Sequence, residues 1–268
     1  IENMLREINI LPQDAVFVDD SEFELEEVGA RLPEITTVRF PRDNSEFLIF
    51  VNDIQDLFAA THLTDEDRRR TDHYKAQETF QKERRSIGNI EEYLDSLRMV
   101  GRISEVENPH EKRPLQLVNK TNQFNLNGLR ETTQSWKHYF NDGARILKVE
   151  LDDCLSNYGV VAILVVKENM PFLDIYQFVL SCRVFSRQLE FGVVDYLNKF
   201  AQTHNMDGLR ILYASTGRNK VLTSFLVQLG NKQATLNEEN PRMIEITLEG
   251  IRRFPGILES SVNWEAAV

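Results

Sequence analysis

The chain has 268 residues, 41% of them hydrophobic and 27% charged, as in folded globular proteins with room for two small domains. Its formal net charge of −11 disfavours sequence-independent binding to the phosphates of a nucleic acid. No stretch approaches the ~18 consecutive apolar residues of a membrane span, so we expect neither nucleic acid nor membrane as a partner. The spacing of Cys154 and Cys182 fits neither a zinc site nor a redox pair, which favours reduced thiols and a cytoplasmic location.

Residues 1–58 predict a strand, helix, strand unit from the C-terminal end of a parallel α/β domain. Residues 15–18 are a continuous apolar run, as expected of a strand buried on both faces. Ser21 begins a helix that Pro33 ends, and residues 36–40 form the next strand. Such elements belong in the middle of a domain, so we expect the chain to be a fragment of a longer protein.

Asp19 and Asp20, at the end of the first strand, predict part of a magnesium site. Ligands of open parallel sheets bind beyond the carboxyl ends of the strands. Two adjacent carboxylates repel each other unless a cation lies between them, and Mg²⁺ prefers oxygen ligands. In the alternative interpretation, one of the two carboxylates caps the following helix. A working site also needs carboxylates from another strand, and no strand-terminal carboxylate precedes Asp19.

A charge-dense helical connector is predicted over residues 59–99, followed by a mixed α/β domain over residues 100–268. The basic cluster of the connector, residues 68–70, is flanked by carboxylates, which favours a solvated helix face over an anion site. In the third segment we expect strands at residues 146–151, 160–166, 175–182, 209–213 and 243–248, helices at 115–118, 189–204 and 221–229, and a short strand or helix at 136–140.

The turn that follows the strand at residues 175–182 is a candidate site for a pyrophosphate. A strand that leads through a turn into a helix presents several backbone N–H groups, and the helix dipole favours an anion there. Arg183 and Arg187 lie on either side of the turn and can add charge-assisted hydrogen bonds. Glycines usually let a phosphate approach such a backbone, but Ser186 and Gln188 hold these positions. A plain turn with two surface arginines is the alternative.

Two polar segments are candidate recognition loops. Residues 119–125 place six polar side chains around one aromatic ring, and residues 216–219 lie beyond the carboxyl end of a predicted strand. The candidate contact residues are Thr121, Asn122, Gln123, Asn125, Thr216 and Asn219. Plain polar loops are the alternative. The histidines show no ligand spacing, and the chain contains no P-loop, Gly-x-Ser-x-Gly or His-Glu-x-x-His motif.

Four segments, in order and spanning nearly the whole chain, together resemble the FkbH-like proteins: DAVFVDDSEFELEEVGARLPEITTVRFP, LTDEDRRRTDHYKAQ, KTNQFNLNGLR and LSCRVFSRQLE. These are haloacid-dehalogenase-superfamily (HAD) enzymes of the type that load a glyceryl unit onto an acyl carrier protein, toward methoxymalonyl-type extender units. The resemblance implies a HAD-type Rossmannoid domain with a nucleophilic Asp in a D-x-D motif and a late acidic motif that binds Mg²⁺. Asp19 and Asp20 match the late motif, and Asp20 is the better ligand. The nucleophilic motif has no match.

The second half of the chain looks like an acetyltransferase-fold (GNAT-like) domain. Acetyltransferases of this fold carry an Arg/Gln-x-x-Gly-x-Gly/Ala turn that cradles the pyrophosphate of coenzyme A. Arg183 matches the first position, but Ser186 and Gln188 replace the two small residues. The bulky Gln188 argues against ordinary coenzyme A binding, so the resemblance also allows the domain to dock the phosphopantetheine arm of a carrier protein, or to be a purely structural partner.

The resulting hypothesis is that the chain is the C-terminal portion of an FkbH-like enzyme, with Mg²⁺ in the complete HAD domain and an acyl carrier protein as its partner. Aspartyl-bound chemistry would precede thioester formation on the carrier. One alternative is an acyl-CoA-dependent N-acyltransferase of the GNAT fold, and another is a non-catalytic carrier-binding module. Replacing Arg183 by Ala separates them, because it weakens binding of coenzyme A or pantetheine only where the turn holds that ligand.

Overall fold

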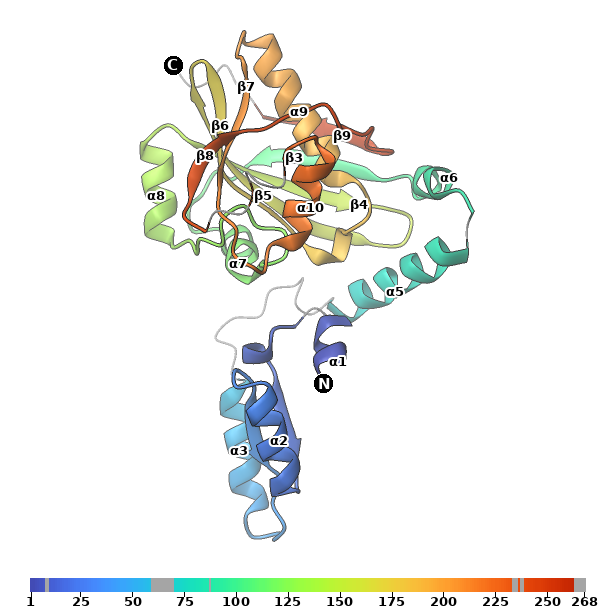
Figure 1. The fold of residues 1–268 in the computed structure, drawn as a ribbon, viewed down its shortest axis with the longest axis vertical. Helices are drawn as coiled ribbons and strands as arrows, with labels where there is room; N and C mark the ends of the chain where they lie inside the picture. Colours follow the sequence, from blue (N-terminus) through green and yellow to red (C-terminus); the bar gives the residue numbers. More distant parts are fainter. Residues whose placement is uncertain (8–9, 59–69, 87, 233–235, 237–238, 263–268) are drawn as a thin grey trace. The chain divides into compact units, whose positions relative to one another are not determined.

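The computed structural model describes residues 1–7, 10–58, 70–86, 88–232, 236 and 239–262, and it divides into two compact units, Ile1–Leu63 and Thr64–Val268 (Figure 1). The two helices of the predicted connector, α5 (Arg70–Ser86) and α6 (Ile90–Ser96), belong to the larger unit. The side chains of the basic cluster at residues 68–70 lie outside the described part. Within that part, no helix is long and apolar enough to cross a membrane.

The smaller unit contains the predicted strand, helix, strand arrangement. Strand β1 (Val16–Asp19) pairs in parallel with β2 (Thr36–Arg39), and α2 (Glu22–Arg31) connects them. The Oγ of Ser21 accepts a hydrogen bond from the Glu24 N–H, as expected of a helix N-cap. The remaining elements of this unit are α1 (Glu2–Glu7), the 3-10 turn η1 (Pro12–Asp14) and α3 (Phe47–Leu57).

The core of the smaller unit is small. Its buried apolar side chains are Leu5, Val28 and Ile35, whereas Val18 on β1 is 38% exposed and Leu48 on α3 is 75% exposed. The prediction that the first strand is buried on both faces is therefore wrong for this structure, because a two-stranded sheet covered by one connecting helix leaves the other face of its strands open. Two strands also do not establish the predicted HAD-type Rossmannoid domain.

The larger unit is built on a seven-stranded mixed sheet in the order β8-β7-β6-β5-β4-β3-β9. Its strands are β3 (Val100–Glu105), β4 (Arg145–Asp152), β5 (Asn157–Asn169), β6 (Phe172–Leu180), β7 (Gly208–Tyr213), β8 (Arg242–Glu245) and β9 (Ile257–Ser260). The pairs β6–β7 and β3–β9 are parallel and all other neighbours are antiparallel. This confirms the mixed α/β domain. The strands β3 and β9 were not predicted, and β9 rather than β8 is the last strand.

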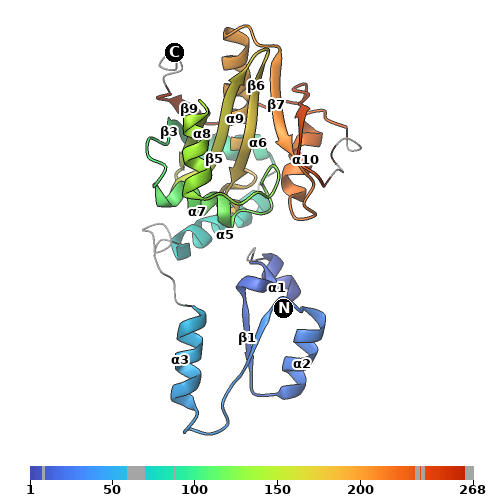
Figure 2. The same cartoon turned by 90° about the vertical axis from the view of Figure 1, so that its left-hand side faces the viewer.

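Helices cover both faces of this sheet (Figure 2). One core contains Leu117 and Trp136 and packs α7 (Lys112–Lys120) and α8 (Thr133–Asn141) on one face. The other core contains residues of α5, α6, α9 (Leu189–Thr203) and α10 (Lys220–Gln228). The ambiguous residues 136–140 are helical, because Thr132 and Ser135 form a capping box that starts α8.

The strands β6 and β7 run together over only part of their length. Their parallel pairing extends from Phe172 opposite Gly208 to Ile175 opposite Ile211, and it ends there although β6 continues to Leu180. Residues 124–127, from the connection between α7 and α8, lie between the two strands beyond that point and bond to both. We call residues 124–127 the wedge segment.

Candidate functional site

The turn between β6 and α9 keeps the backbone shape of a glycine-rich turn without containing glycine. After the short 3-10 turn η2 (Cys182–Val184), Ser186 has a φ of 68° and Gln188 a φ of 63°. Residues with a Cβ rarely adopt this left-handed region, whereas glycine adopts it freely. The two left-handed residues are the two that replace the small residues expected from the resemblance, so the shape of the turn is retained while its side chains have changed.

This turn presents backbone donors at the start of a long helix. Among the described residues, the N–H groups of Ser186, Gln188 and Leu189 have no hydrogen-bond acceptor, and the side chain of Gln188 does not cap α9. The first N–H groups of a helix have no partner within the helix, and the helix dipole places partial positive charge there. The turn therefore has the donor arrangement that binds a phosphate or another oxyanion.

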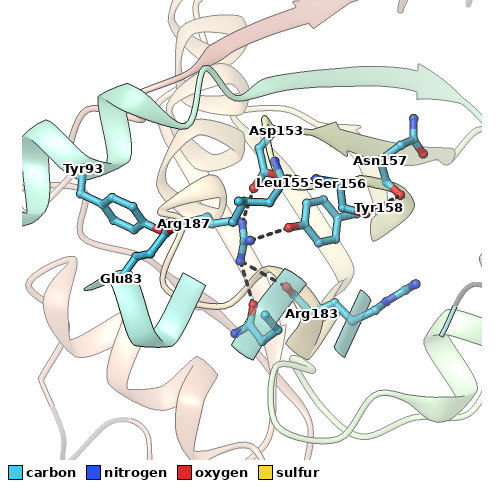
Figure 3. Close-up of polar contacts among 10 residues, drawn as sticks. Glu83, Tyr93, Asp153, Leu155, Ser156, Asn157, Tyr158, Arg183 and Arg187 are labelled. Carbon is cyan, nitrogen blue, oxygen red and sulfur yellow. Dashed lines mark hydrogen bonds and ion pairs between the residues drawn. The ribbon is translucent and has the colours of Figure 1, made fainter. Parts of the chain in front are cut away.

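Arg183 lies at the edge of this turn. Its side chain is partly exposed and its Nε donates a hydrogen bond to Ser181 Oγ at 3.2 Å. Figure 3 shows the Arg183 side chain extending away from the Arg187 guanidinium. The positive charge of Arg183 thus lies next to the turn.

Arg187, the second arginine predicted to bind a ligand, points into the protein instead. Its side chain is fully buried, and it donates from Nε to Asp153 at 2.9 Å, from Nη1 to Gln77 at 2.8 Å and from Nη2 to the Tyr158 hydroxyl at 2.6 Å (Figure 3). These partners satisfy the guanidinium within the fold. Arg187 therefore holds the turn in position and does not offer its charge to a ligand.

The residues that surround Arg187 come from three parts of the larger unit. The guanidinium carbon lies 4.3 Å from the centroid of the Phe80 ring and 4.7 Å from that of Tyr158. Phe80 comes from α5, Tyr158 from β5, and the Asp153 carboxylate also accepts the N–H groups of Leu155 and Ser156 in the β4–β5 hairpin. Burial raises the pKa of the Tyr158 hydroxyl, which keeps it protonated as a neutral partner of the guanidinium.

The two predicted recognition loops do come together, but mainly through buried groups. Asn125 and Asn219 are fully or almost fully buried, and Asn219 Nδ2 donates to the carbonyls of Asn125 at 3.0 Å and Ala214 at 2.8 Å. Asn125 Nδ2 donates to the Thr121 carbonyl at 3.1 Å. This network favours the structural alternative for Thr121, Asn125 and Asn219.

Of the other three candidate contact residues, Asn122 and Gln123 are partly exposed and Thr216 is exposed. Asn122 Oδ1 accepts from Arg130, the Gln123 carbonyl accepts the Leu222 N–H at 3.2 Å, and Thr216 Oγ1 accepts the Asn219 N–H at 3.2 Å. Each of these hydrogen bonds is made to another residue of the larger unit. The side chains of Asn122, Gln123 and Thr216 reach the surface next to the wedge segment, but the contacts described here are internal to the fold.

The acidic pair of the smaller unit is arranged as a turn. Asp19 Oδ1 accepts the Ser21 N–H at 2.8 Å, and the Asp20 carbonyl accepts a hydrogen bond from Arg42. The N-cap of α2 is Ser21, so the alternative in which one carboxylate caps this helix is wrong, and Asp19 instead forms a turn ahead of it. In the described residues, no group of three or more His, Cys, Asp or Glu side chains could hold a metal ion, so the predicted magnesium site gains no support from this geometry.

Glu190, in the first turn of α9, was not identified from the sequence. Its Oε2 is buried and has no hydrogen-bond partner among the described residues, and burial raises the pKa of this carboxyl from 4.5 to about 7. An acidic residue in the first turn of a helix is so common that the sequence offers no signal of this burial. Glu190 thus places a buried carboxyl oxygen at the start of the helix that follows the candidate site.

No family model matches the chain, and no curated protein matches it. Similar solved structures include an acetyltransferase of the GNAT family from Staphylococcus aureus Mu50, at 10% identity and a TM-score of 0.37, covering 53% of this chain and 95% of that one. Glucosamine-6-phosphate N-acetyltransferase from Arabidopsis thaliana matches at 16% identity and a TM-score of 0.33, covering 49% and 91%.

A further similar structure is the ribosomal-protein-S18-alanine N-acetyltransferase from Escherichia coli, at 9% identity and a TM-score of 0.34, covering 47% of this chain and 76% of that one. All three are acetyltransferases. At these identities and TM-scores the likeness carries no argument about activity, substrate or partner.

Proposed function

We propose that the larger unit is a GNAT-like domain that holds the phosphate of a carrier protein's phosphopantetheine at the β6–α9 turn, as part of an FkbH-like acyl-loading enzyme. The turn itself carries the proposal. It combines the N–H groups of Ser186, Gln188 and Leu189, which have no acceptor in the described part of the chain, with the positive end of α9 and the neighbouring charge of Arg183. Together these form a site for one phosphate group.

The charge of the turn favours a carrier-linked phosphate over coenzyme A. Of the two arginines in this turn, Arg187 is satisfied inside the fold, whereas the partly exposed Arg183 lies next to the turn. Coenzyme A carries a pyrophosphate and a third phosphate, whereas a carrier-linked arm carries a single phosphodiester. One arginine and a helix end match the single negative charge of that phosphodiester, while the strongly anionic coenzyme A meets a chain of net charge −11.

Two of the segments that resemble the FkbH-like proteins meet at β6. The segment of residues 120–130 contains the wedge segment beside β6, and the segment of residues 180–190 forms the turn at its end. The two segments that carry the resemblance are therefore adjacent in one structural unit. In this proposal, Mg²⁺-dependent HAD-type chemistry in the complete protein produces the acyl group that the carrier receives, and Asp19 and Asp20 belong to that metal site.

An acyl-CoA-dependent N-acyltransferase is the second candidate, and the same turn is the observation in its favour. The two candidates differ in the ligand they require. A carrier-docking domain distinguishes a carrier with its phosphopantetheine from the same carrier without it, whereas the N-acyltransferase binds free acetyl-CoA and needs no carrier.

The test measures binding of the full chain to a fluorescently labelled acyl carrier protein by anisotropy. The phosphopantetheine-bearing carrier is expected to bind more tightly than the same carrier without the arm. Replacing Arg183 by Ala should weaken that binding roughly tenfold, because a charge-assisted hydrogen bond is lost. Replacing the exposed Arg253 by Ala serves as the control and should leave it unchanged.

Equal binding of the two carrier forms, or binding of neither, would overturn the proposal. Binding of acetyl-CoA alone that also depends on Arg183 would favour the N-acyltransferase.

A further inference from the structure

The edge of β6 next to the candidate site is already occupied by the chain itself. Beyond the end of its pairing with β7, β6 bonds to the wedge segment: Leu126 N donates to the Phe178 carbonyl at 3.3 Å, and Leu180 N donates to the Phe124 carbonyl at 3.1 Å. These bonds place Asn125 opposite Val179 in an antiparallel bridge. The Phe178 carbonyl and the Leu180 N–H, which β6 turns toward β7 in this region, are therefore paired.

The wedge segment also forms hydrogen bonds to β7, on its other side. Ala214 N, just beyond β7, donates to the Leu126 carbonyl at 3.1 Å. The side-chain amide of Asn127 donates to the Tyr176 carbonyl of β6 and to the Leu212 carbonyl of β7, each at 3.0 Å. One side chain thus bonds to both diverging strands at the point where they separate, and the wedge segment joins them like a short additional strand.

The wedge segment is part of the hydrophobic core rather than a cover over it. Phe124, Asn125 and Leu126 are each at most 1% exposed. The Phe124 ring lies 5.1 Å from the ring of Phe178 on β6 and 5.5 Å from that of Phe225 on α10. Removing the segment would expose these rings and leave several backbone groups unpaired, which makes its displacement by a ligand strongly unfavourable.

This arrangement limits where an arm attached to a phosphate at the turn can lie. A pantetheine arm is extended and contains amide groups, and ligands of this kind bind a sheet by pairing with the free edge of a strand. The edge that leads back from the turn is that of residues 176–180 on β6, and the wedge segment already pairs with it. An arm cannot form these hydrogen bonds unless the segment leaves.

We infer that the wedge segment takes the place of an extended ligand arm, so that a pantetheine arm held by its phosphate at the β6–α9 turn remains outside the sheet. This inference rests on the proposed function for the position of the phosphate. The domain then docks a carrier without enclosing its thiol or thioester. The ligand it recognises is a phosphodiester whose arm stays exposed for chemistry elsewhere, and coenzyme A receives no binding site along β6.

The first experiment measures how fast iodoacetamide alkylates the pantetheine thiol of a holo carrier, with the full chain absent or at saturating concentration. Carrier anisotropy in the same samples reports whether the complex has formed. The inference expects alkylation within about twofold of the rate for the free carrier while the anisotropy shows complete binding. Protection of tenfold or more in the complex would overturn it. An unchanged anisotropy would mean that the proposed carrier docking has failed.

The second experiment does not depend on a carrier. Acetyl-CoA is titrated into the isotopically labelled full chain, and the amide resonances of Leu126, Leu180 and Ala214 are followed by NMR. Because their hydrogen bonds stay intact, these resonances should not move, whether or not the ligand shifts Ser186 and Leu189 at the turn. Displacement of the three resonances, saturating with acetyl-CoA, would show that an arm enters between β6 and β7 and would overturn the inference.

Discussion

The Nε of Arg187 lies 2.9 Å from the Asp153 carboxylate, and both side chains are fully buried. A buried ion pair is stable only where further hydrogen bonds satisfy both charges. The Gln77 and Tyr158 side chains provide these bonds to Arg187, and the N–H groups of the β4–β5 hairpin provide them to Asp153. Arg187 therefore anchors the turn that we propose binds a phosphate to the buried interior of the larger unit.

Replacing Arg187 by Ala is expected to lower the free energy of unfolding by about 3–5 kcal/mol, because Asp153 is left as an uncompensated buried charge. Denaturant unfolding of the full chain measures this. Replacing Lys199 by Ala is the control, since Lys199 is 70% exposed and paired with Asp195 one helical turn away, and such pairs contribute less than about 1 kcal/mol. If the Arg187 variant loses no more unfolding free energy than the Lys199 variant, the buried network is contradicted.

Replacing Gln188 by Gly should stabilise the protein, because the residue has a φ of 63° and glycine adopts this conformation without strain. The gain expected is roughly 0.5–1 kcal/mol. Replacing Lys199, an exposed residue inside α9, by Gly should instead cost roughly 0.5–1 kcal/mol. Thermal unfolding of the two variants gives the comparison, and shifts of the same sign would argue against the left-handed turn.

The raised pKa of Glu190 predicts that the stability of the protein depends on pH. Burial raises its pKa from 4.5 to about 7, so between these values the folded protein binds more protons than the unfolded chain. The contribution of Glu190 to the free energy of unfolding therefore falls as the pH rises from about 4.5 to about 7, and the penalty stays at its full size above pH 7.

Replacing Glu190 by Gln should remove this penalty and make the variant more stable than the parent above pH 7, by up to roughly 3 kcal/mol. Urea unfolding at several pH values measures the difference. Replacing Glu91, an exposed acid in the first turn of α6, by Gln should change stability by less than about 0.5 kcal/mol. A difference between the Glu190 variant and the parent that does not grow with pH would refute a buried carboxyl.

Variants of Asn127 test whether its side chain joins β6 and β7 where these two strands diverge. Replacing it by Ala removes donors to the Tyr176 and Leu212 carbonyls and should cost about 1–3 kcal/mol. Replacing it by Asp preserves the shape but sets a carboxylate against both carbonyls, so the cost should be larger. Chemical unfolding of both variants measures the order, and an Asp variant as stable as the parent would exclude the two side-chain bonds.

Much of the larger unit follows from the sequence, because its elements carry local signals. The apolar run of β5 and the amphipathic pattern of α9 predicted a buried strand and a long helix that the structure contains. The strands β3 and β9 were missed because their pairing is non-local. Each is short, and each becomes a strand through the partner it meets, β4 for β3 and β3 for β9.

The location of the turn at the candidate site could be predicted from the sequence, but the directions of its side chains could not. The strand, turn and helix order located the turn, and the resemblance identified Ser186 and Gln188 as the positions where glycine would be expected. The sequence did not show that Arg187 turns inward, because its partners Gln77, Asp153 and Tyr158 lie far away along the chain. It likewise did not show that Asn125 and Asn127 enter the sheet with the wedge segment, since a buried asparagine network has the composition of a loop.

Native-state hydrogen exchange of the full chain tests the central claim most directly. If the wedge segment is a permanent part of the sheet, the amides of Leu126, Leu180 and Ala214 exchange only through global unfolding, as slowly as the amide of Ile163 in the middle of β5. Acetyl-CoA then changes their rates by no more than it changes the rate of Ile163. Exchange of the three amides through local opening, much faster than at Ile163, would contradict the account and make residues 124–127 a removable cover over a ligand site.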